Sequence, residues 1–322
     1  MRQDGWAEGG DGWGADEQQR TRIAWLYYVE GQTQAEIAQR LGINRIKVNR
    51  ELALCRDSGL VQIRINGRLA SCVERERALE RRYGLKEAIV VPSPTPGREL
   101  YQTLGMATGN WVSDRLRPGQ TIAIGWGRTL LWSVRSIRRR QLAGITVVSL
   151  LGGLGRGSEI NTYETASRFA EALGAQCYYM AAPTYASTPE LRDMLMEQAG
   201  VAENYARGRK ADLAVVSVGS LAPGSTMRNL GLLTESEIES LNAAGAVGDL
   251  LGHWIDATGK VIDHPLNRRV VGLPPADLAR LPVAALASGG PTKAQAIHGT
   301  LAGGYCNVLI TDEDTAALLL EG

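Results

Sequence analysis

The sequence predicts an α/β protein in two parts, an N-terminal (winged) helix-turn-helix and a C-terminal Rossmann-like domain built on a parallel sheet. Residues 33–58 have the pattern of two capped helices joined by a glycine turn. From about residue 86, short apolar runs alternate with helical stretches, which is typical of a parallel sheet covered on both faces. Basic residues gather near the amino end, since 20–82 hold 13 Arg or Lys against 7 Asp or Glu, whereas 83–322 hold 21 against 22.

The boundaries follow from these patterns. We expect a disordered tail over 1–16, a DNA-binding domain over 17–70, a linker helix over 71–85 and a larger effector-binding domain over 86–322. A first helix over 17–30 is expected to pack Ile23, Leu26, Tyr27 and Val29 on the helix pair. The alternating run LVQIRI (60–65) suits a half-buried strand, which would be the wing of a winged helix.

The helix pair carries its own start and stop signals. Thr33 and Glu36 form a predicted capping box, and Gly42 supplies the turn. Asn44 is placed to cap the second helix, whose apolar stripe of Val48, Leu52 and Cys55 faces inward. The sequence therefore predicts a helix-turn-helix.

The outward face of the second helix indicates DNA. Asn can bind adenine and Arg can bind guanine through paired hydrogen bonds, and an exposed Ile can touch a thymine methyl group. An ordinary helix pair with solvated cations is the alternative, but the cap, the turn and the outward Ile46 together favour duplex DNA as a partner. The predicted contacts are Thr33, Gln34, Asn44, Arg45, Ile46, Lys47, Asn49 and Arg50.

The remaining apolar runs predict the sheet. Candidate strands cover 88–92, 121–127, 145–153, 175–183, 211–220, 283–290 and 307–313, and candidate helices cover 98–116, 128–139, 162–173, 188–206 and 291–302. Several strands end in glycines, as in GWG, LLGG, VGS and SGG. Glycines between a strand and a helix let a ligand oxygen approach backbone amides, which suits a phosphate, a carboxylate or sugar hydroxyls.

Polar residues near these endings are candidates for a binding site. Trp126 would stack on a sugar face or, alternatively, lie in the core. Asp249 would accept two hydroxyls of a polyol or cap the helix it begins, and Lys293 would neutralise a phosphate or remain a solvated helix lysine. His253 and Asp256 are conceivable catalytic partners, although a lone histidine beside a tryptophan is more often structural, so no catalytic residue is predicted.

Composition excludes several classes. The four cysteines have neither CxxC nor Cys/His spacing, so no zinc site, disulfide framework, metal or cofactor is expected, and a reduced cytoplasm fits. No uncharged apolar run reaches the roughly 18 residues of a membrane span, and the acidic, glycine-rich start lacks the apolar core of a signal peptide. We expect a cytoplasmic protein without a membrane partner.

Four segments together resemble the SorC family of bacterial transcriptional regulators, over about 20–320. They are IAWLYYVEGQTQAEIAQRLGINRIKVNREL, IAIGWGRTL, GAVGDLLGHWID and ASGGPTKAQAIHGTLAGGYCNVLITDEDTA. The resemblance implies a helix-turn-helix joined to an effector domain with the fold of sugar-phosphate isomerases such as glucosamine-6-phosphate deaminase, without their catalysis. It also implies a homo-oligomer, a dimer or tetramer, whose affinity for DNA is altered by a sugar, a sugar phosphate or a polyol.

The resemblance also implies an effector site. Its residues are Gly125, Trp126, Gly127, Arg128, Thr129, Gly152, Gly153, Asp249 and Lys293. Members that take phosphorylated sugars have a loop richer in small hydroxyl residues, where this chain has Trp126 and Arg128, so an unphosphorylated ligand remains open.

The predicted function is therefore regulation of a carbohydrate or polyol catabolic operon. The alternative is a sugar-phosphate isomerase or deaminase with an accessory DNA-binding domain, because aldose–ketose chemistry would use a base such as Asp249 or His253. No paired acid and base at a recognisable spacing supports that alternative.

Overall fold

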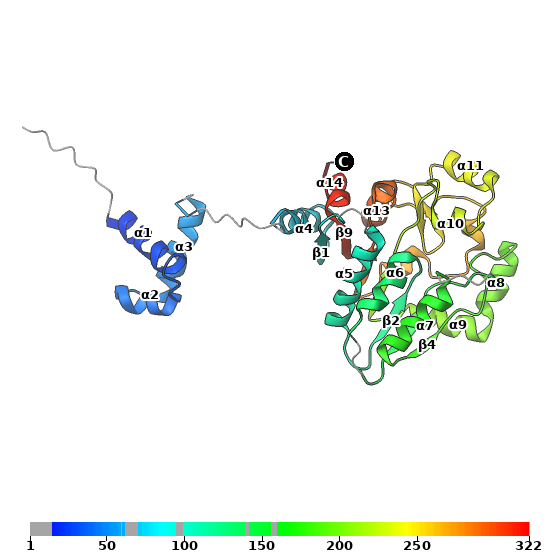
Figure 1. Cartoon of the computed structure of the whole chain (residues 1–322), viewed down its shortest axis with the longest axis horizontal. Coiled ribbons are helices and arrows are strands. Elements are labelled where there is room, and N and C mark those ends of the chain that lie inside the picture. The colour runs from blue at the N-terminus through cyan, green and yellow to red at the C-terminus, as the bar shows by residue number, and fades with distance from the viewer. Residues whose placement is uncertain are drawn as a thin grey trace, which may run out of the picture. The chain divides into compact units, whose positions relative to one another are not determined.

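The computed structural model describes residues 15–58, 60–61, 70–94, 99–138, 142–155 and 160–321. The chain divides into two compact units, Met1–Gly67 and Arg68–Gly322 (Figure 1). The predicted tail lies outside the described residues except for Ala15 and Asp16, which begin α1 (Ala15–Tyr28). The predicted wing also lies mostly outside them. Its two described residues, Leu60 and Val61, form a bend rather than a strand.

The first unit is a three-helix bundle of α1, α2 (Gln34–Leu41) and α3 (Arg45–Asp57). Ile23, Ile37 and Val48, one from each helix, are completely buried against one another. The expectation for Val29 was wrong: α1 ends at Tyr28, before another turn that would bring position 29 to the core, and Val29 is 61% exposed.

Both predicted helix caps are present. The Thr33 side chain accepts a hydrogen bond from the Glu36 amide, and the Glu36 carboxylate accepts one from the Thr33 amide. Gly42 ends α2 in the left-handed conformation, at a φ of 62°. The Lys47 amide donates to Asn44 Oδ1 over 2.7 Å, which fixes the start of α3. The turn between the helices is thus set by local chemistry.

The second unit is built on a seven-stranded parallel sheet in the order β1-β9-β8-β5-β2-β3-β4. Its strands are β1 (Glu87–Val91), β2 (Thr121–Ile124), β3 (Thr146–Ser149), β4 (Gln176–Tyr178), β5 (Leu213–Val216), β8 (Ala284–Ala287) and β9 (Val308–Asp312). Six of them lie inside predicted runs, β1 begins one residue before its run of 88–92, and the glycine endings are loops. Val215 and Val216 of β5 belong to different core clusters, which confirms that the sheet is buried on both faces.

The helices around the sheet follow the prediction in part. The predicted ones are α5 (Leu100–Arg115), α6 (Arg128–Ser133) with the 3₁₀ turn Val134–Ser136, α7 (Thr162–Leu173), α8 (Pro189–Glu197), α9 (Ala199–Gly208) and, after the 3₁₀ turn Pro291–Lys293, α13 (Ala294–Ala302). The stretch 188–206 is two helices because the chain leaves helical geometry at Gln198.

Other elements were missed. They are α10 (Thr226–Asn229), α11 (Glu235–Ala243), the 3₁₀ turn Asn267–Arg269, α12 (Pro275–Leu278), α14 (Glu313–Glu321) and the antiparallel hairpin of β6 (Gly248–Leu250) and β7 (His253–Ile255). Asp249 lies on β6, so it caps no helix. None of the described helices is long and apolar enough to cross a membrane.

Helix α4 (Ala70–Tyr83), the predicted linker helix, belongs to the second unit. It packs on β1 and α14, as Figure 1 shows at one end of the sheet. Because β1 is an edge strand, the amides on its outer side lack a neighbouring strand. Glu76 and Glu80 of α4 accept hydrogen bonds from the amides of Val90 and Ala88, over 2.9 and 3.1 Å. The helix therefore covers the edge and protects it from pairing with another chain.

The capping box at Thr33 yields a stability prediction. Thr33→Ala should destabilise the first unit by about 1 kcal/mol, because the Glu36 amide loses its acceptor. The measurement is hydrogen exchange of α2 amides in the full chain. Thr234→Ala, which removes the equivalent capping box of α11, is the matched control. The prediction would be contradicted if Thr234→Ala increased the exchange rate of α2 amides, or if Thr33→Ala left that rate unchanged.

Candidate ligand pocket and nucleic-acid interface

A pocket lies where the strand order of the sheet reverses. From β2 the chain runs to β3 and β4 on one side, and then returns to β5, β8 and β9 on the other. The loops that follow β2 and β5 therefore leave in opposite directions and open a crevice at the carboxyl ends of the strands. The cavity there has a volume of about 230 Å³, which is somewhat below the roughly 300–1,000 Å³ of most sites for small ligands.

Five segments line this pocket. They are the start of α5 with Glu99 and Tyr101, the loop Trp126–Thr129 after β2, the segment Ser217–Met227 after β5, Asp249 on β6, and Gly289, Thr292 and Lys293 after β8. Segments far apart in the sequence thus meet at one edge of the sheet.

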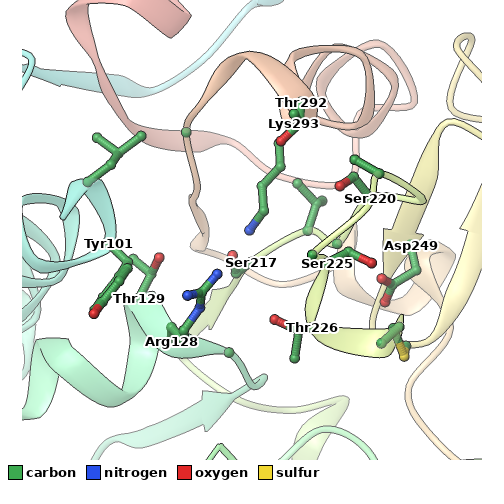
Figure 2. Close-up of a pocket in the computed structure, with 18 of the residues that line it drawn as sticks. Tyr101, Arg128, Thr129, Ser217, Ser220, Ser225, Thr226, Asp249, Thr292 and Lys293 are labelled. Atoms are coloured by element: carbon green, nitrogen blue, oxygen red, sulfur yellow. The ribbon is translucent and has the colours of Figure 1, made fainter. Parts of the chain in front are cut away.

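The two cations of the pocket lie together. Figure 2 shows the side chains of Arg128 and Lys293 extending toward one another into the cavity, with Asp249 across from them. The Arg128 guanidinium lies over the Tyr101 ring, 5.0 Å from its centre. Burial lowers the pKa of Lys293; the charge of Asp249 opposes this shift and that of Arg128 adds to it. Among the described residues neither cation has a salt bridge, so both remain available to an anion.

Asp249 is the buried carboxylate of the site. It is 2% exposed and accepts a hydrogen bond from the Gly252 amide over 3.0 Å. Burial raises its pKa to about 6, although the Gly252 bond and the charge of Lys293 partly oppose that shift. Gly219 lies directly beside it, and a side chain at that position would collide with the carboxylate as it stands. Such a group can accept ligand hydroxyls.

Hydroxyl side chains fill the wall between the charges. They are Thr129, Ser217, Ser220, Ser225, Thr226 and Thr292, all of which Figure 2 labels. The Ser225 oxygen is buried and has no hydrogen-bond partner among the described residues. Sequence reasoning predicted Thr129 but missed the other five. The signal for four of them was the run SVGSLAPGST (217–226), which is rich in small hydroxyl residues and overlaps the end of a predicted strand.

The structure brings together six of the nine residues predicted for this site: Trp126, Gly127, Arg128, Thr129, Asp249 and Lys293. Trp126 also belongs to the hydrophobic core and is only 7% exposed, so little of its ring is available for stacking. Gly125 does not line the cavity.

Gly152 and Gly153 lie outside the pocket as well, which corrects their assignment. A side chain at Gly152 would collide with the Pro183 carbonyl, and one at Gly153 with the Tyr163 ring. These glycines allow close packing after β3.

The conceivable catalytic pair is not assembled. His253 is buried outside the pocket, with Nδ1 3.1 Å from the Leu251 carbonyl oxygen, and burial lowers its pKa to about 4. The Asp256 carboxylate instead accepts hydrogen bonds from Thr258 and Lys260. Within the described ranges, no three His, Cys, Asp or Glu side chains are grouped to hold a metal ion.

In the first unit, α3 presents the predicted DNA-contacting residues. Ile46 is 81% exposed, and Arg45, Asn49 and Arg50 are exposed beside it. Lys47 is half-buried. The side-chain oxygens of Thr33 and Asn44 serve as helix caps, which gives these two residues a structural role of their own.

A buried carboxylate holds Arg50 in place. Glu51 accepts hydrogen bonds from Arg20 of α1 over 2.9 Å and from Arg50 over 3.3 Å. The bond from Arg20 is the main reason that the pKa of Glu51 is lowered. This arrangement joins α1 to α3 and leaves most of the Arg50 side chain, 70%, in solvent.

Known proteins are similar to this chain over both of its units. The family model "Putative sugar-binding domain" matches residues 67–321. The erythritol catabolism regulatory protein EryD of Brucella abortus is 34% identical over 95% of this chain and 97% of its own length. The deoxyribonucleoside regulator of Bacillus subtilis is 32% identical over 94% of this chain and 97% of its own.

A solved structure covers nearly the same range. The full-length sorbitol operon regulator SorC from Klebsiella pneumoniae matches with a TM-score of 0.73 and 28% identity, over 94% of this chain and 98% of its own. The likeness therefore includes the helix-turn-helix as well as the α/β unit.

Asp249 yields a prediction about pH. In the folded protein the pKa of Asp249 is about 6, against the ordinary value of 3.8, because the buried carboxyl group holds its proton more tightly. Its contribution to the free energy of unfolding is therefore full below pH 3.8 and is lost as the pH rises through about 6. His253, whose pKa is lowered to about 4, changes stability with the opposite sign over a similar range. Asp249→Asn removes the titration of Asp249 and leaves that of His253. It should therefore stabilise the ligand-free protein by about 3 kcal/mol at neutral pH and by less below about pH 6.

Denaturant unfolding across this pH range measures the effect. The control is Asp263→Asn, which changes a carboxylate in an exposed salt bridge with Arg268 and should bring no gain. A gain from Asp249→Asn that did not depend on pH would contradict the assigned cause.

Proposed function

The chain belongs to the SorC family of sugar-responsive transcriptional regulators, and on that premise we propose that its pocket binds a small sugar or polyol bearing an anionic group, with phosphate as the simplest case. As its relatives are, the chain is a DNA-binding regulator of catabolic operons that an effector modulates. What the pocket adds is the chemistry of that effector.

One observation carries the proposal: two cations without salt bridges lie opposite a buried carboxylate. Confined cations of like charge repel each other, and an anion placed between them removes that cost. The planar guanidinium of Arg128 suits paired hydrogen bonds to a phosphate, and Lys293 adds a point charge. Asp249 then accepts hydroxyls at the other end of the ligand.

The size and wall of the cavity support the same class. A volume of about 230 Å³ favours a compact ligand over a nucleotide. The hydroxyl side chains provide donors and acceptors between the charged ends, and Ser225 has an unsatisfied oxygen to offer. An uncharged polyol would satisfy Asp249 and these hydroxyls, yet would leave Arg128 and Lys293 without a counter-ion.

For the DNA-binding unit, we propose that Ile46, Asn49 and Arg50 meet base edges while Arg45 and Lys47 meet phosphates. The exposure of Arg45, Ile46, Asn49 and Arg50 on the first turns of α3 supports a role for this helix in reading DNA. We further propose a homo-oligomer acting in the cytoplasm, because paired recognition helices read paired half-sites. Catalysis forms no part of the proposal, since the relatives are named as regulators.

Arg50→Ala should weaken operator binding by about 1–3 kcal/mol and should reduce discrimination against random duplex, because a base contact is lost. Fluorescence anisotropy with the chain's own promoter fragment measures both affinities at one fixed salt concentration. Arg268→Ala is the matched control, since Arg268 is also exposed and paired with a carboxylate but belongs to the other unit. Unchanged discrimination in Arg50→Ala would contradict the base contact.

The ligand class is tested by thermal shift with sugars and polyols offered alongside their phosphates, beginning with erythritol and erythritol 4-phosphate. A phosphorylated compound should raise the melting temperature more than its parent does, because binding to the native state stabilises it. Arg128→Ala should weaken the phosphorylated ligand by about tenfold or more and the parent compound little, since it removes charge-assisted hydrogen bonds.

Lys210→Ala, at an exposed lysine outside the pocket, is the control for net charge. The proposal of an anionic ligand would be wrong if the parent compound bound as well as its phosphate and Arg128→Ala left both affinities unchanged. Turnover of any of these phosphates by the purified protein would instead support the enzyme alternative.

A further inference from the structure

The loop that carries Lys293 is bonded to the start of α14. Gly290 donates its amide proton to Thr315 Oγ1 over 2.7 Å. Thr315 is completely buried and Gly290 is partly buried, which limits the access of water to this bond. Gly290 has a φ of 98°, a conformation that other residues rarely adopt, and the direction of its amide depends on that conformation. The position of the loop is thus linked to that of Thr315.

Thr315 is in turn fixed to the end of β9. Its hydroxyl donates to Asp312 Oδ1 over 2.5 Å, and its amide donates to Asp312 Oδ2 over 3.1 Å. A side chain at Gly289 would collide with Asp312, so the pocket loop and the end of β9 are in direct contact.

The residue after Asp312 reaches α4. Glu313 Oε1 accepts a hydrogen bond from Ser71 over 2.7 Å and one from the Arg75 guanidinium over 2.5 Å. These two bonds, with that from Ser71 the larger cause, lower the pKa of Glu313. Ser71 and Arg75 lie one turn apart on the same side of α4. Ser71 is four positions after Gly67, where the DNA-binding unit ends.

The other end of α4 is attached to the same part of the fold. The Tyr83 hydroxyl lies 2.8 Å from His298 Nδ1 on α13 and 3.2 Å from the Leu319 carbonyl oxygen on α14. Helix α13 begins immediately after Lys293. Both ends of α4 therefore contact elements that adjoin the pocket loop.

We propose that a hydrogen-bond relay from Gly290 through Thr315, Asp312 and Glu313 to Ser71 and Arg75 couples occupancy of the pocket to α4, and through α4 to the DNA-binding unit. The proposal rests on the proposed function only in taking this pocket as the effector site. An effector that pairs with Lys293 stabilises one position of the pocket loop. Through the relay, that position of the loop changes the free energy with which α4 is held against α14.

The variable step of the relay is its last one. Asp312 and Thr315 are buried and mutually satisfied, whereas the side chains of Glu313 and Arg75 are 28% and 29% exposed. Water can replace the partners of Glu313 at little cost, so this contact can open while the buried steps remain intact. The expected change on effector binding is therefore at the junction of α14 with α4.

A double-mutant cycle without ligand tests the relay in the full-length protein. Thr315→Val and Glu313→Gln should each speed hydrogen exchange in the first turns of α4 by about two- to tenfold, as expected for a lost hydrogen bond. The effects should not add, because both substitutions break one chain of contacts. Thr315→Ser, which keeps the hydroxyl, should behave like the wild type.

Glu87→Gln is the matched control. Glu87 accepts bonds from the Trp111 indole and from Arg115, and its side chain is 28% exposed, as that of Glu313 is. It should leave exchange in the first turns of α4, around Ser71 and Arg75, unchanged. The relay is overturned if Thr315→Val speeds exchange in α14 but not in α4, or if its effect adds fully to that of Glu313→Gln.

A second measurement uses erythritol 4-phosphate as the probe. In the wild type it should alter the exchange of α4, and Glu313→Gln should abolish that change while binding the probe within about twofold of the wild-type affinity. If the probe still alters the exchange of α4 in Glu313→Gln, the relay is contradicted. A wild-type protein that binds no phosphorylated probe contradicts the proposed function instead, and the ligand-free cycle still decides the relay.

Discussion

The strand order of the sheet is the constraint on which the site depends. Both faces of the sheet are filled by apolar side chains, so polar groups can gather only at its ends. The reversal between β2 and β5 then opens one place at the carboxyl end where loops separate. Arg128 follows β2, Ser217 follows β5 and Lys293 follows β8. Their convergence is therefore a consequence of topology.

The charges gathered there are costly to the empty protein. Burial raises the pKa of Asp249 and lowers that of Lys293, so each group is less stable in its charged form than it would be in water. A core residue under selection for stability alone would be apolar. Retaining ionisable groups in a pocket without salt bridges is consistent with a ligand that completes their interactions, and the stability the free protein forgoes is recovered when that ligand binds.

The sequence predicted features whose causes are local. The capping box at Thr33, the turn at Gly42 and the seven apolar runs each depend on residues within a few positions of one another. The hairpin around Asp249 was missed because strands of three residues show no detectable period. The segment Ser217–Met227 and the misplacement of Gly152 and Gly153 reflect a different limit. Which loops meet in space depends on strand order, and glycines that permit packing look the same in sequence as glycines that admit a ligand.

The two units bear differently on regulation. The DNA-binding unit has its own apolar core, and hydrogen bonds that Asn44 and Glu51 accept within that unit hold α3 at its start and near its middle. Reshaping α3 from a distance would break contacts made within that unit, at a cost of several kcal/mol. Opening the junction of α4 with α14 requires only that Glu313, whose side chain is 28% exposed, exchange its partners Ser71 and Arg75, while the contacts of α4 with β1 and α13 remain. The less costly route favours regulation through placement of an unchanged reading helix, as in rigid-body switches, over remodelling of the helix itself.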